Sequence, residues 1–378
     1  TRRSAKPQAA NPRMETVSPP PSHRQFPCKN CGANLQFMPG THSLVCPYCG
    51  MSNEIAPSNE RIEELDFTRH LDAIPPEQML ETLAVRCNTC GAETTLKPNV
   101  TASRCPFCGS AIVAQAVSRR LIKPRGLLPF HVTQEEAGEL FKQWIASRWF
   151  APGALRRRAE RANIDGVYMP AWTYDADTTT RYTGERGEDY WETQTYTTIE
   201  NGRPVTRTQQ VRKTRWYPAA GTVYNVFDDV LVPASRSVPE AHVYELEPWD
   251  MSNLTAYQDG YLSGFVSESY QIDLPQGFEV AKGLMEGTIR ATIYADIGGD
   301  HQRVNWLQTR YDNITFKHIL LPVWISAYRL YDRTFRFLVN ARTGEVQGDR
   351  PYSWVKITLL IVTILIVLAM VMLATSGR

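Results

Sequence analysis

The pattern of apolar positions is most pronounced near the C-terminal end of the chain. Residues 357–374 form a run of eighteen, all apolar except Thr358 and Thr363. As a helix, this run would rise about 27 Å, close to the thickness of a hydrocarbon core. A buried helix of a soluble domain is the alternative, but the run has no charge and no polar stripe to face water. The pattern therefore predicts one transmembrane helix over 355–375.

The flank of this run supports the same prediction. Interfacial aromatic residues and cations precede it, namely Arg350, Tyr352, Trp354 and Lys356. Because basic residues favour the cytoplasmic side of a membrane, the large N-terminal part is expected in the cytoplasm. We expect a single-pass, tail-anchored protein, or a chain cut just after its first span.

Helical periodicity recurs elsewhere in the chain. A capping box, Thr133-x-x-Glu136, precedes apolar residues on one helical face, namely Ala137, Leu140, Phe141, Trp144 and Ile145. Pro152 is expected to end this helix, and a short second helix is expected to carry Arg156, Arg157, Arg158 and Arg161. Further helices are predicted over 60–71, 75–85, 249–269 and 275–293.

From Val167 onward the pattern changes to that of strands. The runs 189–199 and 204–217 flank Asn201-Gly202, and Asn-Gly between alternating runs is a strong hairpin signal. Both arms are rich in Thr, Tyr and Gln, so we expect an at least half-solvated hairpin that projects as a contact surface. Strands are also predicted over 304–311, 318–331 and 334–339.

Two hexapeptides in this region resemble each other. Residues 167–172 read Val-Tyr-Met-Pro-Ala-Trp, and residues 319–324 read Ile-Leu-Leu-Pro-Val-Trp. Each precedes an alternating strand and then a turn rich in Thr and Gly. The similarity predicts two related β-units within the body.

Composition and charge limit the remaining interpretation. The chain has 378 residues, 43% of them hydrophobic, which permits a sizeable core. The formal net charge of +2 argues against a dedicated polyanion binder. Residues 1–24 are basic and rich in proline, which predicts a disordered arm. We expect a helical spacer over 57–84 and an α+β cytoplasmic body over 117–350.

All eight cysteines lie in the first third of the chain and form one pattern that occurs twice in tandem. The pattern is Cys-x2-Cys, a gap of fourteen residues and a second Cys-x2-Cys. The first quartet is Cys28, Cys31, Cys46 and Cys49, and the second quartet is Cys87, Cys90, Cys105 and Cys108. Both copies also share Cys-Gly-Ala after the first pair and Cys-Pro-aromatic-Cys-Gly at the second. The pattern predicts two zinc ribbons, over 25–56 and 85–116.

Four thiolates satisfy a tetrahedral zinc ion, so we predict two zinc ions, one per cysteine quartet. Such closed sites leave no coordination position for a water nucleophile and are structural. Disulfides fit poorly, because the chain shows nothing like a signal peptide and paired Cys-x2-Cys spacing indicates metal. Iron is the competitor, because Cys-Pro-Tyr-Cys-Gly resembles a rubredoxin knuckle, although the fourteen-residue gap is much shorter than in rubredoxin.

Catalytic motifs are absent from the sequence. It has no phosphate-binding Gly-x4-Gly-Lys-Ser/Thr loop, no His-Glu-x-x-His, no Gly-x-Ser-x-Gly and no Gly-x-Gly-x-x-Gly. The seven histidines are scattered, and the adjacent Asp228 and Asp229 would point to opposite faces of a strand. We therefore predict no catalytic residue and no organic cofactor site, and we do not expect an enzyme.

The layout resembles a family of bacterial membrane-tethered double zinc-ribbon proteins. The matching stretches are Leu127-Leu128-Pro129-Phe130, Arg148-Trp149-Phe150-Ala151-Pro152, residues 166–172, residues 337–340 and residues 351–357. Members are often labelled primosomal helicase-like. Some are associated with flotillin-like (SPFH) and phage-shock-protein-A-type membrane stress systems, where they look like membrane adaptors. The resemblance covers most of residues 25–375 and implies zinc ribbons on a cytoplasmic body at the bacterial inner (plasma) membrane. It does not imply helicase activity, because the phosphate-binding loop is missing.

These observations support a multi-domain fold with two tandem zinc ribbons, an α+β body with β-rich hairpins and one C-terminal transmembrane helix. The leading functional hypothesis is a membrane-anchored adaptor or scaffold that recruits cytoplasmic protein partners. The family resemblance implies that it does so in envelope stress. The alternative is a membrane-tethered, nucleic-acid-binding zinc-ribbon protein without helicase activity. Against nucleic-acid binding, the ribbons carry few basic residues that could contact phosphates, namely Lys29, Arg86, Lys97 and Arg104. The sequence names neither the partner nor the oligomeric state.

Overall fold

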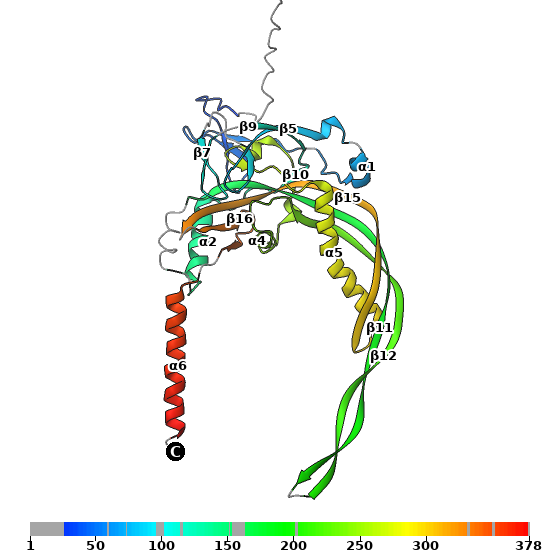
Figure 1. Ribbon diagram of the computed structural model, residues 1–378. Coiled ribbons are helices and arrows are strands. Elements are labelled where there is room, and N and C mark those ends of the chain that lie inside the picture. The colour runs from blue at the N-terminus through cyan, green and yellow to red at the C-terminus, as the bar shows by residue number, and fades with distance from the viewer. Residues whose placement is uncertain are drawn as a thin grey trace, which may run out of the picture.

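The computed structural model describes residues 26–58, 60–72, 74–95, 102–113, 116–150, 152, 163–200, 203–330, 333–349 and 352–376. A nine-stranded sheet lies at its centre, with the two cysteine-bearing segments above it in the view of Figure 1. The main path through the sheet is β12-β11-β15-β10-β13. The predicted basic arm over 1–24 and the arginine-rich helix predicted near 156–161 lie outside the described residues.

Three long antiparallel strands dominate the sheet. They are β11 (Asp165–Glu200), β12 (Arg203–Pro233) and β15 (His301–Leu330). β15 accompanies β11 only as far as the pair Gly187↔His301, whereas β12 stays paired with β11 to Glu200↔Arg203. Residues 188–200 and 203–215 therefore continue alone as a two-stranded segment, which we call the projecting hairpin (Figure 1). The hairpin predicted around Asn201-Gly202 is confirmed as the end of a much longer strand pair.

Shorter strands complete the central sheet. β16 (Arg333–Asn340) pairs with β15 and with β17 (Val346–Gly348), and β14 (Val266–Ser267) runs parallel to β11. β10 (Gly126–Leu127) is parallel to β15 and antiparallel to β13 (Thr255–Ala256), while β4 (Leu65–Asp66) pairs with β15. The strands predicted over 304–311 and 318–331 are parts of one continuous strand, β15.

Burial along β11 changes in three steps that explain its sequence. From Val167 to Tyr174 every side chain is buried or nearly so, because both faces of the sheet are covered. From Ala176 to Tyr182 only alternate residues are buried. These face α5 (Leu274–Ile297), whose buried side chains recur every three or four residues. Past Gly187 none of the helices that the structure describes covers either face, which is why Thr, Gln and charged residues prevail there (Figure 1).

The two similar hexapeptides lie side by side in this sheet. Val167 pairs with Val323, and Ala171 pairs with Ile319, so the segments run antiparallel to each other. After each hexapeptide the chain turns back in an antiparallel strand, β12 for the first and β16 for the second. The residue just after that strand bonds to the proline of the same hexapeptide, Pro170 or Pro322. This arrangement supports the predicted relation between two β-units, the first made of β11 and β12 and the second of β15 and β16.

The first β-unit is closed by a circuit of four hydrogen bonds. The Ala234 N–H donates to the Pro170 carbonyl at 2.9 Å. The Ala234 carbonyl in turn accepts from the N–H groups of Gln271 and Ile272, at 2.8 and 3.2 Å. Trp172 Nε1 then donates to the Ile272 carbonyl at 2.9 Å. Ile272 directly precedes the N-cap of α5, so this circuit holds the start of that helix.

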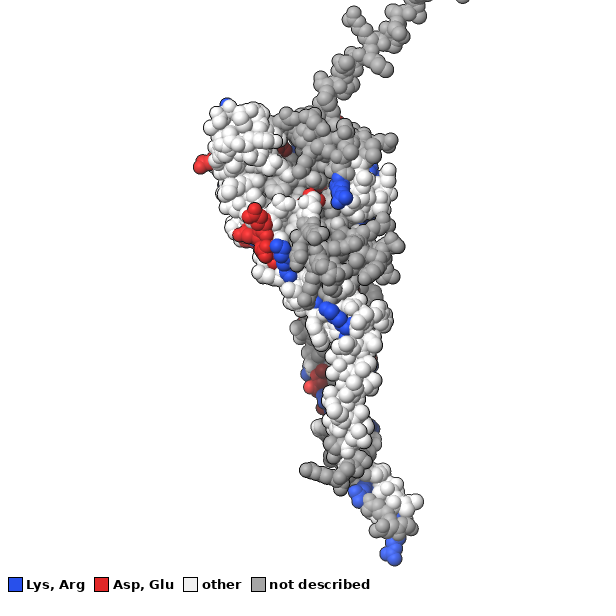
Figure 2. All heavy atoms as spheres, turned by 90° about the vertical axis from the view of Figure 1, so that its left-hand side faces the viewer, with Lys and Arg blue, Asp and Glu red and all other residues white. Residues whose placement is uncertain are grey.

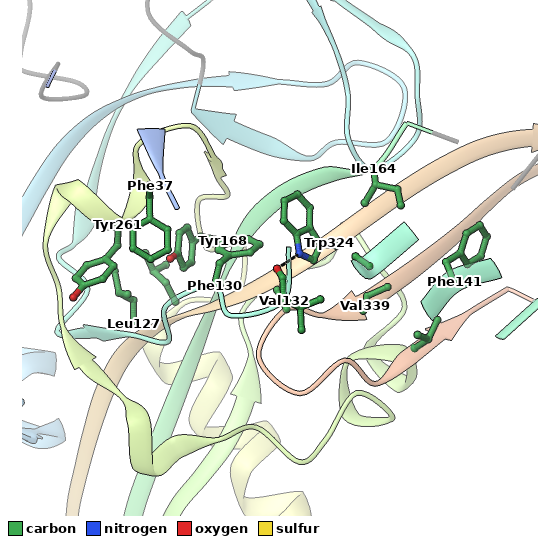
Figure 3. Packing of buried hydrophobic residues seen from close by; sticks show 14 of the residues in the cluster. Phe37, Leu127, Phe130, Val132, Phe141, Ile164, Tyr168, Tyr261, Trp324 and Val339 are labelled. Carbon is green, nitrogen blue, oxygen red and sulfur yellow. Dashed lines mark hydrogen bonds between the residues drawn. The ribbon is translucent and has the colours of Figure 1, made fainter. Parts of the chain in front are cut away.

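The second β-unit repeats the circuit bond for bond. The Ala341 N–H donates to the Pro322 carbonyl at 3.0 Å. The N–H groups of His131 and Val132 donate to the Ala341 carbonyl at 2.9 and 2.8 Å. Trp324 Nε1 donates to the Val132 carbonyl at 2.8 Å, the bond drawn in Figure 3. Val132 directly precedes the N-cap of α2 (Gln134–Ala146).

The two units therefore exchange helices. α2 precedes β11 in the chain, yet its start is held by Trp324 and Ala341 of the second unit. α5 precedes β15, yet its start is held by Trp172 and Ala234 of the first unit. Each unit thus depends on the other for the helix that covers it, which joins them into one body.

The capping box of α2 is confirmed, since Thr133 and Glu136 satisfy each other's backbone N–H groups. The helix predicted over 275–293 is confirmed as α5. The helix predicted over 249–269 is wrong, because this segment forms η2 (Met251–Asn253), β13, η3 (Asp259–Leu262) and β14. Two glycines interrupt it, Gly260 and Gly264, and its short strands satisfy free edges of the central sheet.

The helical spacer predicted over 57–84 is also wrong for most of its length. α1 (Phe67–Asp72) is the one α-helix within the described residues of that segment. The helix predicted over 75–85 is instead η1 (Pro76–Gln78) followed by β5 (Met79–Arg86). β5 pairs with β9 (Ala116–Ile122) and with β6 (Glu93–Thr95), so pairing with a distant segment outweighs local helix propensity. The strands of the second ribbon consequently begin before 85 and end after 116.

The apolar run predicted as a transmembrane segment forms α6 (Trp354–Ser376). A stretch of 20 residues within it, Trp354–Leu373, is long and apolar enough to cross a membrane, and none of that stretch is buried inside the protein. In Figure 2 this helix forms a white column that carries charge only near its start. Its contacts with the body lie at that start, where the Lys356 ammonium donates to the Trp149 carbonyl at 2.8 Å.

Candidate metal centres

All four Cys-x2-Cys turns share one backbone geometry. The glycine after each pair has φ between 70° and 77°, the left-handed region that favours glycine. Each of these glycines donates its N–H to the carbonyl of the first cysteine of its turn, at 2.8–3.0 Å: Gly32 to Cys28, Gly50 to Cys46, Gly91 to Cys87 and Gly109 to Cys105. The repeated glycine is thus required by the turn that aims the sulfur atoms.

Each cysteine quartet converges on one point. Within each quartet the four Sγ atoms all lie within 4.8 Å of one another. In the first quartet the Sγ–Sγ distance is 3.4 Å for Cys31–Cys46 and 3.5 Å for Cys28–Cys49. In the second quartet Cys87–Cys108 and Cys90–Cys105 are both 3.6 Å apart. Four thiolates about 2.3 Å from a zinc ion would be about 3.8 Å apart, so both quartets are close to the size that zinc requires.

The thiols of the second quartet lie close enough to change each other's ionisation. A hydrogen bond from Cys105 lowers the pKa of Cys90 to about 5. The same hydrogen bond, together with burial, raises the pKa of the Cys105 thiol. One thiolate therefore suppresses ionisation of its neighbour, as expected for like charges at close range. A divalent ion at the centre would remove this conflict, so the donor set fits zinc, with iron in the same tetrahedron as the competing occupant.

The two quartets differ in exposure. In each, the first cysteine of both turns is buried: Cys28, Cys46, Cys87 and Cys105. The second cysteines are exposed in the first quartet, Cys31 and Cys49, and only partly exposed in the second, Cys90 and Cys108. The aromatic residue of the second turn follows the same trend, since Tyr48 is 84% exposed whereas Phe107 is 0% exposed.

The first ribbon is formed by β1 (Gln36–Phe37), β2 (Ser43–Val45) and β3 (Ser52–Glu54) and contacts the body through its strands. The Phe37 N–H donates to the Ser263 carbonyl at 2.9 Å, and the Ser263 hydroxyl donates to the Leu35 carbonyl at 2.6 Å. The ring of Phe37 lies 5.1 Å from that of Tyr261 and reaches into an aromatic cluster of the body (Figure 3). The turns that carry Cys31 and Cys49 face solvent instead.

The second ribbon is held at its metal end as well as along its strands. Arg336 of β16 donates from Nε to the Phe107 carbonyl at 2.6 Å, inside the turn that ends in Cys108. Phe107 belongs to a hydrophobic cluster with Ile319 and Leu321 of β15. The Ser110 hydroxyl lies 3.3 Å from Cys87 Sγ and 3.0 Å from Cys108 Sγ. The matching position of the first ribbon, 59 residues earlier, is Met51, which has no hydroxyl.

On its other side, the second ribbon is joined to the body at β6 and β9. The Ser269 N–H donates to the Glu93 carbonyl at 2.9 Å, and the Thr95 hydroxyl donates to the Ser267 carbonyl at 3.1 Å. At the end of β9, the buried His318 donates from Nδ1 to the Ile122 carbonyl at 2.8 Å. Burial lowers the pKa of His318 to about 4, so its ring is neutral at pH 7.

A third group of possible ligands brings together Glu64, Asp175 and Asp228. Sequence reasoning considered only the neighbours Asp228 and Asp229 and missed Glu64, because its approach depends on β4 pairing with β15. Lys317 provides the positive charge here. Its ammonium lies 2.7 Å from Asp229 and 3.1 Å from Glu64. Burial alone would lower the pKa of Lys317, but these carboxylates outweigh burial and raise it. Of the three carboxylates in this group, Glu64 is therefore paired with a buried cation, Lys317.

Comparison with known proteins gives one relative. The chain is 26% identical over 333 residues, 87% of its length, to an uncharacterized protein of Bacillus subtilis, YdjG, of which it covers 90%. No family model matches the chain, and no solved structure matches it significantly. The similarity thus extends over most of the chain, without indicating an activity.

Proposed function

We propose that this protein is a membrane-anchored adaptor whose two zinc ribbons and β-rich body recruit cytoplasmic protein partners at the inner membrane of a bacterium. The observation that carries the proposal is α6. Its apolar side chains are exposed over most of the helix, from Leu359, 67% exposed, to Leu373, 75% exposed. A helix of a soluble core would be buried, whereas a bilayer would cover this surface on all sides.

The adaptor role is supported by how the remainder of the chain is built. Closed four-thiolate sites shape a surface and leave no open position for catalysis. The projecting hairpin extends two strands away from the body and exposes large side chains, including Trp191 at 67% and Ile199 at 76%. Exposed apolar residues on an otherwise polar strand pair are typical of a contact surface for another protein. The family resemblance points to flotillin-like or phage-shock-protein-A-type partners.

The first experiment tests the anchor. Full-length protein is expressed in bacteria, and membranes are washed with alkaline carbonate, which retains only integral proteins. The variant Leu365→Arg/Leu368→Arg places two charges at the centre of α6, each costing about 2.5–3.5 kcal/mol in a bilayer. We expect the unchanged protein and the matched Leu365→Phe/Leu368→Phe control in the pellet and the arginine variant in the wash. Unchanged protein in the wash would exclude a transmembrane α6.

The second experiment tests recruitment. Cross-linked affinity purification from native membranes is compared for the unchanged protein, for Trp191→Ala/Ile199→Ala on the projecting hairpin and for Tyr48→Ala on the first ribbon. All three eluates are analysed for metal, with about two zinc ions per chain expected. Recovery of a flotillin-like or phage-shock-type partner supports the adaptor, and its loss in the hairpin variant locates the contact.

The nucleic-acid alternative predicts a different result from the same purification. DNA or replication proteins would be recovered, and affinity for DNA would fall steeply with salt because binding releases counterions from phosphates. A flat response to salt, or no binding, removes this alternative. A visible absorption spectrum separates zinc from iron, since iron held by four thiolates is coloured.

A further inference from the structure

The two quartets present the same four ligands with unequal protection. Around the first quartet, residues 29–32 and 47–51 are all exposed. Around the second, residues 105–107 are buried and residues 108–110 are half-buried against the body. Because small oxidants reach sulfur only through solvent, this difference matters chemically.

The first quartet also has the geometry for forming a disulfide. The Sγ atoms of Cys31 and Cys46 are 3.4 Å apart, and those of Cys28 and Cys49 are 3.5 Å apart. Each of these pairs joins one exposed and one buried sulfur. The exposed member is accessible to an oxidant, and the buried member is in place to attack the oxidised sulfur.

We infer that the first quartet is a peroxide-sensitive modification site that releases its zinc on oxidation, whereas the second quartet retains its zinc. This inference rests on the zinc occupancy proposed above. The second quartet has equally close sulfur pairs, at 3.6 Å, so sulfur spacing does not separate the two sites. The two sites differ in how they are covered. Phe107, held by Arg336, is buried beside the second quartet, whereas Tyr48 at the matching position of the first quartet is exposed.

The chemical step balances with a peroxide as the oxidant. The exposed Cys31 thiolate attacks one oxygen of hydrogen peroxide, the O–O bond breaks, and a sulfenic acid and hydroxide are formed. The Cys46 thiolate then attacks the oxidised sulfur, the S–O bond breaks, and a second hydroxide leaves as the disulfide forms. The two cysteines lose two electrons and the peroxide gains them. Two of the four sulfurs that would hold zinc are then joined to each other, so the site would no longer retain the ion.

The structural effect of oxidation is confined to the turns of the first ribbon. The strands of the first ribbon keep contacts with the body that do not pass through the metal, such as the bonds between Ser263 and residues Leu35 and Phe37. The exposed turns that carry Cys31 and Cys49 lose the ion that shapes them. Oxidation would therefore remodel an exposed surface while the second ribbon and the sheet stay folded.

The test uses full-length protein in detergent micelles, loaded with zinc and freed of excess metal. Hydrogen peroxide is added, released zinc is followed with a chromogenic chelator, and cysteine oxidation is mapped by peptide mass spectrometry. We expect two kinetic phases of one zinc ion each, the first on the order of tenfold faster or more. Peptides containing Cys31 or Cys49 should be disulfide-linked after the first phase, with those containing Cys90 or Cys108 still reduced.

Matched variants show which quartet gives rise to each kinetic phase of zinc release. Cys31→Ser should remove the fast phase and leave the slow one, whereas Phe107→Ala should open the second quartet and speed the slow phase. Tyr48→Ala, at the corresponding exposed position, should leave both rates unchanged. Because zinc release and thiol mapping require no functional assay, the result does not depend on the identity of a partner.

Three outcomes overturn the inference, and they are distinguishable. A protein that carries two zinc ions but releases both at one rate contradicts unequal protection and leaves the zinc assignment standing. A purified chain that binds no zinc contradicts the assignment and the inference together. Faster release from the second quartet, with Cys90 oxidised before Cys31, would reverse the proposed order and also overturn it.

Discussion

The two ribbons of this protein carry one ligand pattern and are covered in different ways. In the second ribbon the aromatic residue of the second turn, Phe107, is buried against β15 and β16, whereas Tyr48 at the same position of the first ribbon is exposed. Arg336 holds the turn of Phe107, and the first ribbon is held through Phe37 and its strands instead. The comparison teaches that ligand spacing specifies a metal site, while the surface packed against that site decides its exposure.

The largest expected effect comes from breaking each quartet in turn. Metal binding contributes on the order of 10–16 kcal/mol to folding in small zinc domains. Cys105→Ser should destabilise the second ribbon and the hydrophobic cluster it shares with the body, giving an insoluble or broadly protease-sensitive protein. Cys46→Ser should leave the body folded and expose only the first ribbon. Limited proteolysis with mass spectrometry distinguishes these patterns, and equal sensitivity of the body in both variants would contradict the comparison.

The next effect concerns the matched aromatic pair. Phe107→Ala removes a fully buried ring and should lower the free energy of unfolding by about 3–5 kcal/mol. Tyr48→Ala removes a ring that is 84% exposed and should change it by less than about 0.5 kcal/mol. Denaturant titration in micelles measures both. A destabilisation by Tyr48→Ala as large as that by Phe107→Ala would show that the two turns are equally covered.

Acidification should weaken the attachment of the second ribbon through His318. Burial holds the pKa of His318 at about 4 in the folded protein, below its usual value of 6.5. The unfolded chain therefore binds more protons below pH 6.5, so stability is fully present above that pH and is lost as pH falls towards 4. The loss is about 3 kcal/mol, at 1.36 kcal/mol per pKa unit.

The variant His318→Asn checks this assignment, because asparagine does not titrate and keeps a donor for the Ile122 carbonyl. Its free energy of unfolding should fall less steeply between pH 6.5 and 4 than that of the unchanged protein. Hydrogen exchange should show the loss in β9, at the edge of the second ribbon, ahead of the first ribbon. Identical slopes for both proteins would assign the pH dependence to other groups.

The smallest effects come from single hydrogen bonds that join each ribbon to the body. Arg336→Met removes the charged donor to the Phe107 carbonyl while keeping much of the side-chain volume, and should cost about 1.5–3 kcal/mol. Ser263→Ala removes the neutral donor to the Leu35 carbonyl and should cost about 1 kcal/mol. Hydrogen exchange should locate each loss in its own ribbon. Loss of protection in both ribbons from either variant would indicate that they are coupled through the sheet.

The elements with strong local signals were predictable from the sequence. The capping box at Thr133 and Glu136, the Asn-Gly hairpin and the apolar run of α6 each depend on a few neighbouring residues. The helix predicted over 75–85 was wrong, because β5 is a strand through its pairing with β9, more than thirty residues away. The helix predicted over 249–269 was wrong for a similar reason, since its short strands form at edges that other segments leave open.

The relation between the two β-units was visible only in part. Two similar hexapeptides indicated related strands, but nothing in the sequence indicated that α2 would be held by Trp324 and α5 by Trp172. Each hydrogen-bond circuit passes through the backbone of one alanine, Ala234 or Ala341, whose side chain carries no signal for it. These hydrogen bonds join residues that are far apart in the sequence, so they depend on the tertiary fold.

The eight cysteines, their grouping into two quartets and a C-terminal helix with the length and composition of a membrane span all follow from the sequence. These properties are local, because a Cys-x2-Cys turn aims its sulfurs within five residues and an apolar run has its length wherever it lies. That the second quartet is less exposed than the first follows from tertiary packing alone. The reason is that burial of Phe107 and exposure of Tyr48 depend on strands of the body more than two hundred residues further along the chain.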